Sequence, residues 1–228
     1  MQFRQKQRQK QNESARERRR DRMLEDLSRH GGAILDSQEM RQAFRQKHHK
    51  LSTVGDHTMR VARASLGICY ALDKLKIPTD IPAVVTGSLC HDLGILGRDE
   101  KYSSDKECGQ QHPVDSVDTA HKLLGELPEK TEDIISRHMW PFAGSKPPNS
   151  LEAAIVSTAD KLASVEDYVK GIRKKAAQVA DGLGRKEDTK APEKQAETET
   201  GHAQGGAAWK TKRELSDWQS PSGKDRCG

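Results

Sequence analysis

The chain has 228 residues, of which 33% are hydrophobic and 32% are charged, and its formal net charge is +5. This length leaves room for one domain with extensions, and the low apolar content excludes a chain that is packed throughout. It contains no apolar run of about 18 residues, so no membrane-spanning helix is predicted. The four cysteines form no Cys-x-x-Cys pair and no secretory signal is recognisable, so we expect a cytoplasmic protein with free thiols.

The positive charge is concentrated at the N-terminus. Residues 1–22 hold nine Arg and Lys against three Asp and Glu, whereas residues 182–228 hold nine against eight, and the part between them carries a net charge of −2. We interpret residues 1–22 as a basic arm, either a solvated helix or disordered. Contact of this arm with nucleic acid is left open, although no aromatic residues are interleaved to stack on bases. Because the part of the chain between these two segments is not basic, we do not expect its surface to bind nucleic acid.

A helical domain is predicted over residues 23–183, where apolar residues recur at spacings of three and four. We expect an all-α bundle of about five core helices. Two short helices should flank the Gly31–Gly32 pair, because glycine disfavours a helix interior. Residues 184–228 lack this periodicity and are interpreted as a low-complexity, disordered tail.

The first core helix is expected over residues 54–76. An apolar stripe runs along it through Val61 and Ile68, and His57 lies at the N-terminal end of that stripe. A histidine in this position is a candidate ligand facing the domain interior. His49, eight residues earlier, is a candidate neighbour of the same site.

The second core helix is expected over residues 82–92, with Asp80 as its N-cap. It ends in His91 and Asp92, which would both face the buried side if the helix continues that far. A buried carboxylate beside an imidazole is costly unless something compensates it, and a divalent metal does so well.

Further polar residues lie on or beside apolar helical faces. His112 precedes Pro113 and suits the first turn of a helix. His138 and Asp160 lie in later apolar segments. His121, at the edge of a helical face, is interpreted as a structural residue. Taken singly, each is typical of a satisfied or exposed polar residue. Their number around one His–Asp pair favours a shared metal centre. The predicted helices here span 113–127, 130–139 and 150–181, the last capped by Ser150.

The order His57, His91–Asp92 and Asp160 resembles that of the HD superfamily of metal-dependent phosphohydrolases. The resemblance covers roughly residues 45–170 and implies an HD-type helical bundle. Residues 138–141 and 159–161 are similar to segments of small bacterial HD-domain proteins.

His112 and His138 resemble the additional ligands of the HD proteins that bind two metals. The resemblance implies one ion held by His57, His91, Asp92 and Asp160, and a second held by Asp92, His112 and His138, with Asp92 bridging. The expected cofactor is a divalent transition metal, with Fe, Mn, Zn and Co left open.

The implied activity is hydrolysis of a phosphoester in a small, nucleotide-like substrate by a metal-activated hydroxide. Asp92 and His91 are the expected catalytic residues. Many relatives carry a lysine after the His-Asp-x-Gly segment, where this chain has Ile95. The candidates for contacting the phosphoryl oxygens are therefore Arg98, Lys101 and Arg137.

Two other functions are consistent with the same residues. A minority of HD proteins are di-iron oxygenases, which use the same ligands. The chain could also be a catalytically inactive sensor or adaptor that binds metal through the same residues.

Overall fold

The structure is a computed structural model of the chain, and it describes residues 1–49 and 52–184. The chain divides into two compact units, Met1–Asp167 and Tyr168–Gly228. Nearly all of the predicted C-terminal tail lies outside the described residues, and the predicted limits of arm, domain and tail stay predictions. Within the described part, no helix combines the length and apolar character needed to cross a membrane.

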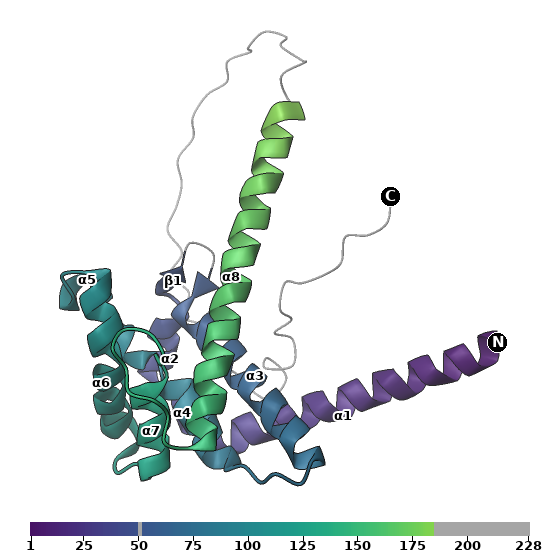
Figure 1. Cartoon of the computed structure of the whole chain (residues 1–228), viewed down its shortest axis with the longest axis horizontal. Coiled ribbons are helices and arrows are strands. Elements are labelled where there is room, and N and C mark those ends of the chain that lie inside the picture. Colours follow the sequence, from purple (N-terminus) through teal and green to yellow (C-terminus); the bar gives the residue numbers. More distant parts are fainter. Residues whose placement is uncertain (50–51, 185–228) are drawn as a thin grey trace, which may run out of the picture. The chain divides into compact units, whose positions relative to one another are not determined.

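Helices dominate the described residues, as expected for an all-α fold (Figure 1). A two-stranded antiparallel sheet, β1 (Lys47–His49) with β2 (Ser52–Thr53), is the only sheet in this part of the chain. The helices are α1 (Gln2–Leu35), α2 (Gln38–Ala43), α3 (Val54–Lys74), α4 (Ile81–Cys90), the 3₁₀ turn η1 (Leu93–Ile95), α5 (Arg98–Lys101), α6 (Asp105–Leu124), α7 (Glu129–Arg137) and α8 (Leu151–Gly184).

Helix α4 is the central element of the first unit. Asp80 caps it as predicted, because its carboxylate accepts a hydrogen bond from the backbone N–H of Ala83 at 3.1 Å. The helix is apolar on all sides, as expected for a helix covered by others, and it contacts α1, α3 and α7. Its C-terminus therefore delivers His91 and Asp92 into the protein interior.

The core around α4 is built from the apolar faces that the sequence predicts. Val61 of α3, Val84 of α4, Ile134 of α7 and Val156 of α8 belong to one cluster of buried side chains. Helix α3 begins with a capping box in which Thr53 and Asp56 satisfy each other's backbone N–H groups. His57 is thus fixed in the first turn of α3, on the side that faces this core.

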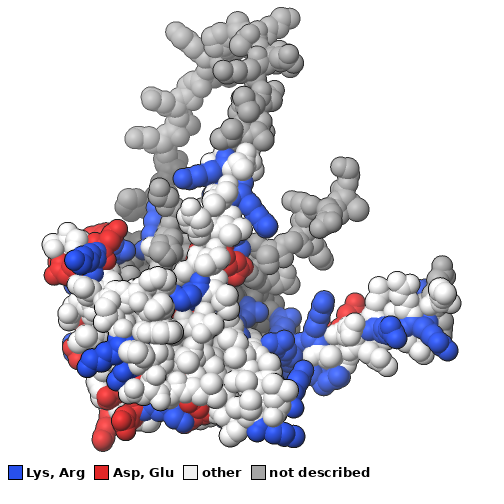
Figure 2. Space-filling view, viewed as in Figure 1, with Lys and Arg blue, Asp and Glu red and all other residues white. Residues whose placement is uncertain are grey.

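The predicted break at Gly31–Gly32 is wrong, since α1 continues through both glycines to Leu35. A Cβ atom on Gly31 would lie 2.3 Å from Cδ1 of Leu89 on α4. Gly31 therefore permits a close approach of two helices and does not end one. The predicted basic arm is the first part of this same helix, and Figure 2 shows Lys and Arg side chains along it.

The predicted start of the third core helix is also wrong. Helix α6 begins at Asp105, and the hydroxyl of Ser104 accepts from the backbone N–H of Glu107 at 3.2 Å. Pro113 lies inside the helix, so His112 is well beyond the first turn. The second core helix ends at Cys90, slightly earlier than predicted, and His91 is its C-cap.

Helix α6 and η1 are locked together at Gly94. The backbone N–H of Gly94 donates to the hydroxyl of Ser116 at 2.8 Å. A Cβ on Gly94 would lie 2.4 Å from both the carbonyl O of His112 and the N of Ser116. This contact between backbones holds the segment after Asp92 directly against the turn of α6 that carries His112.

Candidate metal centre

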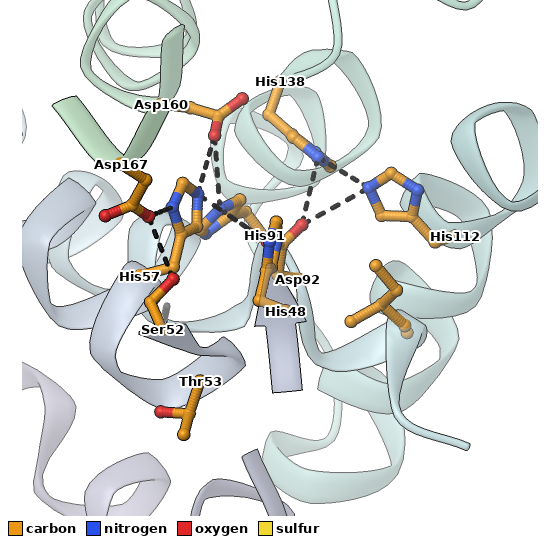
Figure 3. A network of polar contacts seen from close by, with 12 residues as sticks. His48, Ser52, Thr53, His57, His91, Asp92, His112, His138, Asp160 and Asp167 are labelled. Carbon is orange, nitrogen blue, oxygen red and sulfur yellow. Dashed lines mark hydrogen bonds and ion pairs between the residues drawn. The ribbon is translucent and has the colours of Figure 1, made fainter. Parts of the chain in front are cut away.

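The structure brings all six predicted ligands together in the interior of the first unit (Figure 3). They come from the start of α3, the end of α4, the middle of α6, the end of α7 and the third turn of α8. All six are buried. The potential ligand atoms of His57, His91 and Asp160 lie within 4.8 Å of one another, and so do those of Asp92, His112 and His138.

Asp92 lies between these two groups, and each of its carboxylate oxygens faces a different one. Oδ2 lies 3.4 Å from Nε2 of His91 and 3.8 Å from Nε2 of His57. Oδ1 lies 3.3 Å from Nε2 of His112 and 3.5 Å from Nε2 of His138. This is the arrangement expected of a carboxylate that bridges two cations.

Three of the imidazoles are fixed by main-chain carbonyls. The Nδ1 atoms of His91, His112 and His138 each lie 2.7 Å from a carbonyl oxygen one helical turn earlier, those of Ser88, Cys108 and Ile135. A carbonyl can only accept, so each Nδ1 must be the donor. When the ring is neutral, the proton therefore lies on Nδ1 and the lone pair on Nε2. This is the form in which Nε2 can bind a metal while Nδ1 keeps its hydrogen bond.

Because their Nδ1 atoms are fixed as donors, His112 and His138 turn their Nε2 atoms toward each other. Their Nε2 atoms are 3.0 Å apart, and two lone pairs at this distance would repel each other unless a cation lies between or beside them. Burial favours a lower pKa for both rings. At His112 the Asp92 carboxylate outweighs burial, and the pKa of this ring is raised. At His138 burial prevails, and the pKa falls to about 4. A proton on His112 therefore fills the place that a metal ion could take.

His91 gives an independent test of whether the residues fit a metal. Its Nε2 is buried and has no hydrogen-bond partner among the described residues. It lies 3.4 Å from Asp92 Oδ2 and 4.0 Å from Asp160 Oδ1. A buried polar atom without a partner needs an explanation, and a divalent cation among these three side chains supplies one. The donor set of imidazole nitrogens and carboxylate oxygens fits such an ion.

Both carboxylates are anionic at neutral pH. Burial would raise the pKa of Asp92, but attraction to the His91 imidazole and hydrogen bonds from His112 and His48 hold it well below its usual range. Burial is likewise outweighed at Asp160, where the hydrogen bond from His57 lowers the pKa. Two buried negative charges are costly without compensating cations.

His57 differs from the other three histidines because carboxylates flank both of its nitrogens. Its Nε2 lies 2.8 Å from Oδ1 of Asp160, and its Nδ1 lies 3.9 Å from Oδ2 of Asp167. Burial alone would lower the pKa of His57, but these two carboxylates outweigh it and raise the pKa to about 9. A metal that binds Nε2 must therefore displace a proton.

Sequence reasoning missed His48 and selected His49 as the neighbour of the site. Nε2 of His48 lies 3.1 Å from Oδ2 of Asp92, and its ring stacks on that of His57 with centroids 4.5 Å apart. His48, His57 and Asp92 form a third close group of potential ligand atoms. The side chain of His49 lies outside the described part of the structure. No helical periodicity applies in this short strand, so the sequence offered no reason to choose between the two.

Lys161 was also missed as a participant. Its Nζ lies 2.7 Å from Oδ2 of Asp160 and donates to the carbonyl of His138 at 2.7 Å. Its position directly after the candidate ligand Asp160 could have indicated that it lies close to the site.

The three basic residues predicted to bind substrate have other partners in the structure. Arg98 pairs with the exposed Asp105, and Lys101 donates to the carbonyl of Gly94 at 3.2 Å. Arg137 pairs with Asp133 at 2.6 Å. Their role toward a substrate stays a prediction.

His121 lies outside the cluster. Its Nε2 lies 2.8 Å from Oε1 of Glu132 and its Nδ1 lies 2.9 Å from the carbonyl of Gly125. The ring thus links the end of α6 to α7 at a partly exposed position.

Residues 54–164 match the family model of the HD domain. No curated protein and no solved structure matches the chain. The matched span contains all six predicted ligands in the order that suggested the family. The chain therefore contains an HD domain, at residues 54–164.

Proposed function

We propose that the chain is a metal-dependent phosphohydrolase that cleaves a phosphoester bond in a small, nucleotide-like substrate. The HD superfamily, to which residues 54–164 belong, consists mostly of metal-dependent hydrolases. The observation that carries the proposal is the position of Asp92, whose two oxygens face two separate groups of histidines. A centre with two ions is suited to displacement at phosphorus.

The residues divide into two sets that share Asp92. His57, His91 and Asp160 would hold one ion, and His112 and His138 the other. When bound, such ions lower the pKa of water and neutralise negative charge on a phosphoryl group.

The chain's own residues supply rigidity and a dry environment. Hydrogen bonds to main-chain carbonyls hold the rings of His91, His112 and His138 in one orientation. Burial of His91 and Asp92 strengthens electrostatic interactions with a charged substrate, because few water molecules screen them. Both are proposed as catalytic residues.

Positive charge for the phosphoryl oxygens would come from Arg98, Lys101 or Arg137. The contact between Lys101 and the Gly94 carbonyl, at 3.2 Å, supports this residue most directly. It brings the ammonium group to the segment that follows Asp92. A lysine there would act as a point charge toward phosphate.

The test compares Asp92→Asn with His121→Gln. Asn keeps the size of Asp92 but removes the charge that two dications require, so we expect loss of metal and of the hydrolysis of nucleotides and model phosphodiesters. His121→Gln should keep both and cost on the order of 1 kcal/mol in stability. Metal content and the rate of hydrolysis, followed as phosphate released from nucleotides and alcohol released from phosphodiesters, are measured side by side.

Two outcomes would contradict the proposal. One is a His121→Gln protein that has lost its metal while Asp92→Asn retains it. The other is an iron-loaded wild-type protein that consumes oxygen and hydrolyses no phosphoester, which would favour the di-iron oxygenase alternative.

A further inference from the structure

We propose that Asp167 is a positioning residue that keeps Nδ1 of His57 as the donor nitrogen, so that Nε2 and Asp160 are both available to a metal. This inference rests on the proposed metal binding. Asp167 itself would not touch the ion, since it faces Nδ1 of His57 whereas Asp160 faces Nε2 (Figure 3).

The other three candidate histidines have their tautomer fixed by a carbonyl, and His57 does not. Nδ1 of His57 is buried and has no hydrogen-bond partner among the described residues. The acceptor it faces is Oδ2 of Asp167, at 3.9 Å. Asp167 thus faces Nδ1 of His57 on the side where the carbonyl of Ser88 faces Nδ1 of His91, although the distance to Asp167 is longer than the 2.7 Å to Ser88.

Asp167 is held in place by groups other than His57. Seven residues after Asp160 on α8, it lies on the same face of that helix and is 6% exposed. The hydroxyl of Ser52 on β2 donates to its Oδ2 at 3.0 Å, and the guanidinium of Arg60 on α3 donates to the same oxygen. A carboxylate offers about four acceptor positions, so it can also accept from His57.

Binding of a metal removes one of the ring protons of His57, and the two possible positions of the remaining proton have opposite consequences for metal binding. A proton on Nε2 donates to Asp160 at 2.8 Å and occupies both potential ligands at once. A proton on Nδ1 points toward Asp167 and leaves both ligands free. A carboxylate beside Nδ1 stabilises the second form and makes the metal-binding nitrogen more basic.

The test uses Zn²⁺ as a diamagnetic probe with full-length wild type, Asp167→Asn and Asp167→Leu. Zn²⁺ affinity is measured by competition with a chromophoric chelator, and the protonated ring nitrogen of His57 is identified by ¹⁵N NMR. We expect Asp167→Leu to weaken binding by about 10–100-fold and to lose the Nδ1 proton signal. Asp167→Asn, which keeps an acceptor without the charge, should fall between Leu and wild type.

Asp26→Asn is the matched control. Asp26 is a partly buried carboxylate on α1 that accepts from the hydroxyl of Tyr70 at 2.6 Å, so this variant removes the same charge away from the centre. It should retain wild-type Zn²⁺ affinity and the wild-type His57 signal.

Failure of this inference can be distinguished from failure of the proposed function. Folded Asp167 variants with wild-type affinity and an unchanged His57 Nδ1 proton would overturn the role of Asp167 while leaving the metal centre intact. If Asp167→Leu does not fold, the same readouts on Asp167→Asn decide. A wild-type protein that binds no transition metal would instead overturn the proposed function, and the role of Asp167 with it.

Discussion

Lys161 donates a hydrogen bond from its Nζ to the main-chain carbonyl of His138, at 2.7 Å. The same ammonium group lies 2.7 Å from Oδ2 of Asp160. One partly buried lysine therefore ties two candidate ligands, from different helices, to each other. It also leaves Oδ1 of Asp160 facing His57.

Replacing Lys161 with Met should destabilise the metal-free protein. The variant keeps the unbranched chain up to the ε position but removes the ammonium group and both of its hydrogen bonds, one of them to a charged group. Because the side chain is 24% exposed, we expect a loss of about 1–2 kcal/mol in the free energy of unfolding. Urea denaturation in the presence of a chelator measures it. Lys122→Met, at an exposed position of α6, is the control, and equal stability of the two variants would contradict the assigned role.

Metal content should change in steps when single ligands are removed. We expect about two ions per wild-type chain, because the candidate ligands form two sets around Asp92. His112→Ala and His138→Ala should each retain one ion, and His57→Ala should retain the other one. Elemental analysis and native mass spectrometry give the stoichiometry. A wild-type protein that holds only one ion at saturating metal would rule out the two-ion centre.

The close contact at Gly94 predicts an intolerant position. In Gly94→Ala the new Cβ would meet backbone atoms of His112 and Ser116, which cannot move aside as a flexible side chain can. We expect a loss of about 1–3 kcal/mol or more, together with weaker metal binding on the His112 side, measured by thermal denaturation and metal titration.

Gly109→Ala, in α6, provides the comparison. Its Cβ would lie 3.6 Å from Cβ of Ala143 and 3.8 Å from Cε of Met139, which are ordinary contact distances. Alanine is also preferred over glycine inside a helix by about 0.5–1 kcal/mol. Gly109→Ala should therefore be as stable as wild type or slightly more so, and a loss similar to that of Gly94→Ala would show that the explanation is wrong.

His57, His138 and Asp160 were predictable as candidate ligands because each occupies a polar position within an apolar helical pattern. His57 and Asp160 lie at three- and four-residue spacing from core residues, so the sequence indicated which way they face. The structure adds the distances between them, which depend on how α3 and α8 pack and cannot be derived from either helix alone.

The errors have causes of three kinds. Local preference was overruled by packing at Gly31, where the absence of a Cβ permits contact with Leu89. A capping signal was overlooked at Ser104-Asp105-Lys106-Glu107, whose Ser-x-x-Glu pattern marks a helix start, and Pro113 was given more weight than it deserved. His48 and Asp167 were missed because their relevance arises from contacts across the fold, to Asp92 and His57 respectively.

The separation of His57 and Asp160 along the chain, 103 positions, has a consequence for how the protein is made. During synthesis the N-terminal part of a chain leaves the ribosome first, so His57 emerges long before Asp160. Until α8 has been synthesised and has packed against α3, the first group of ligands lacks one member. An ion that joins the two residues would close a long loop of chain, as a reversible cross-link does. Capture of that ion would thus be one of the last events in the maturation of the domain.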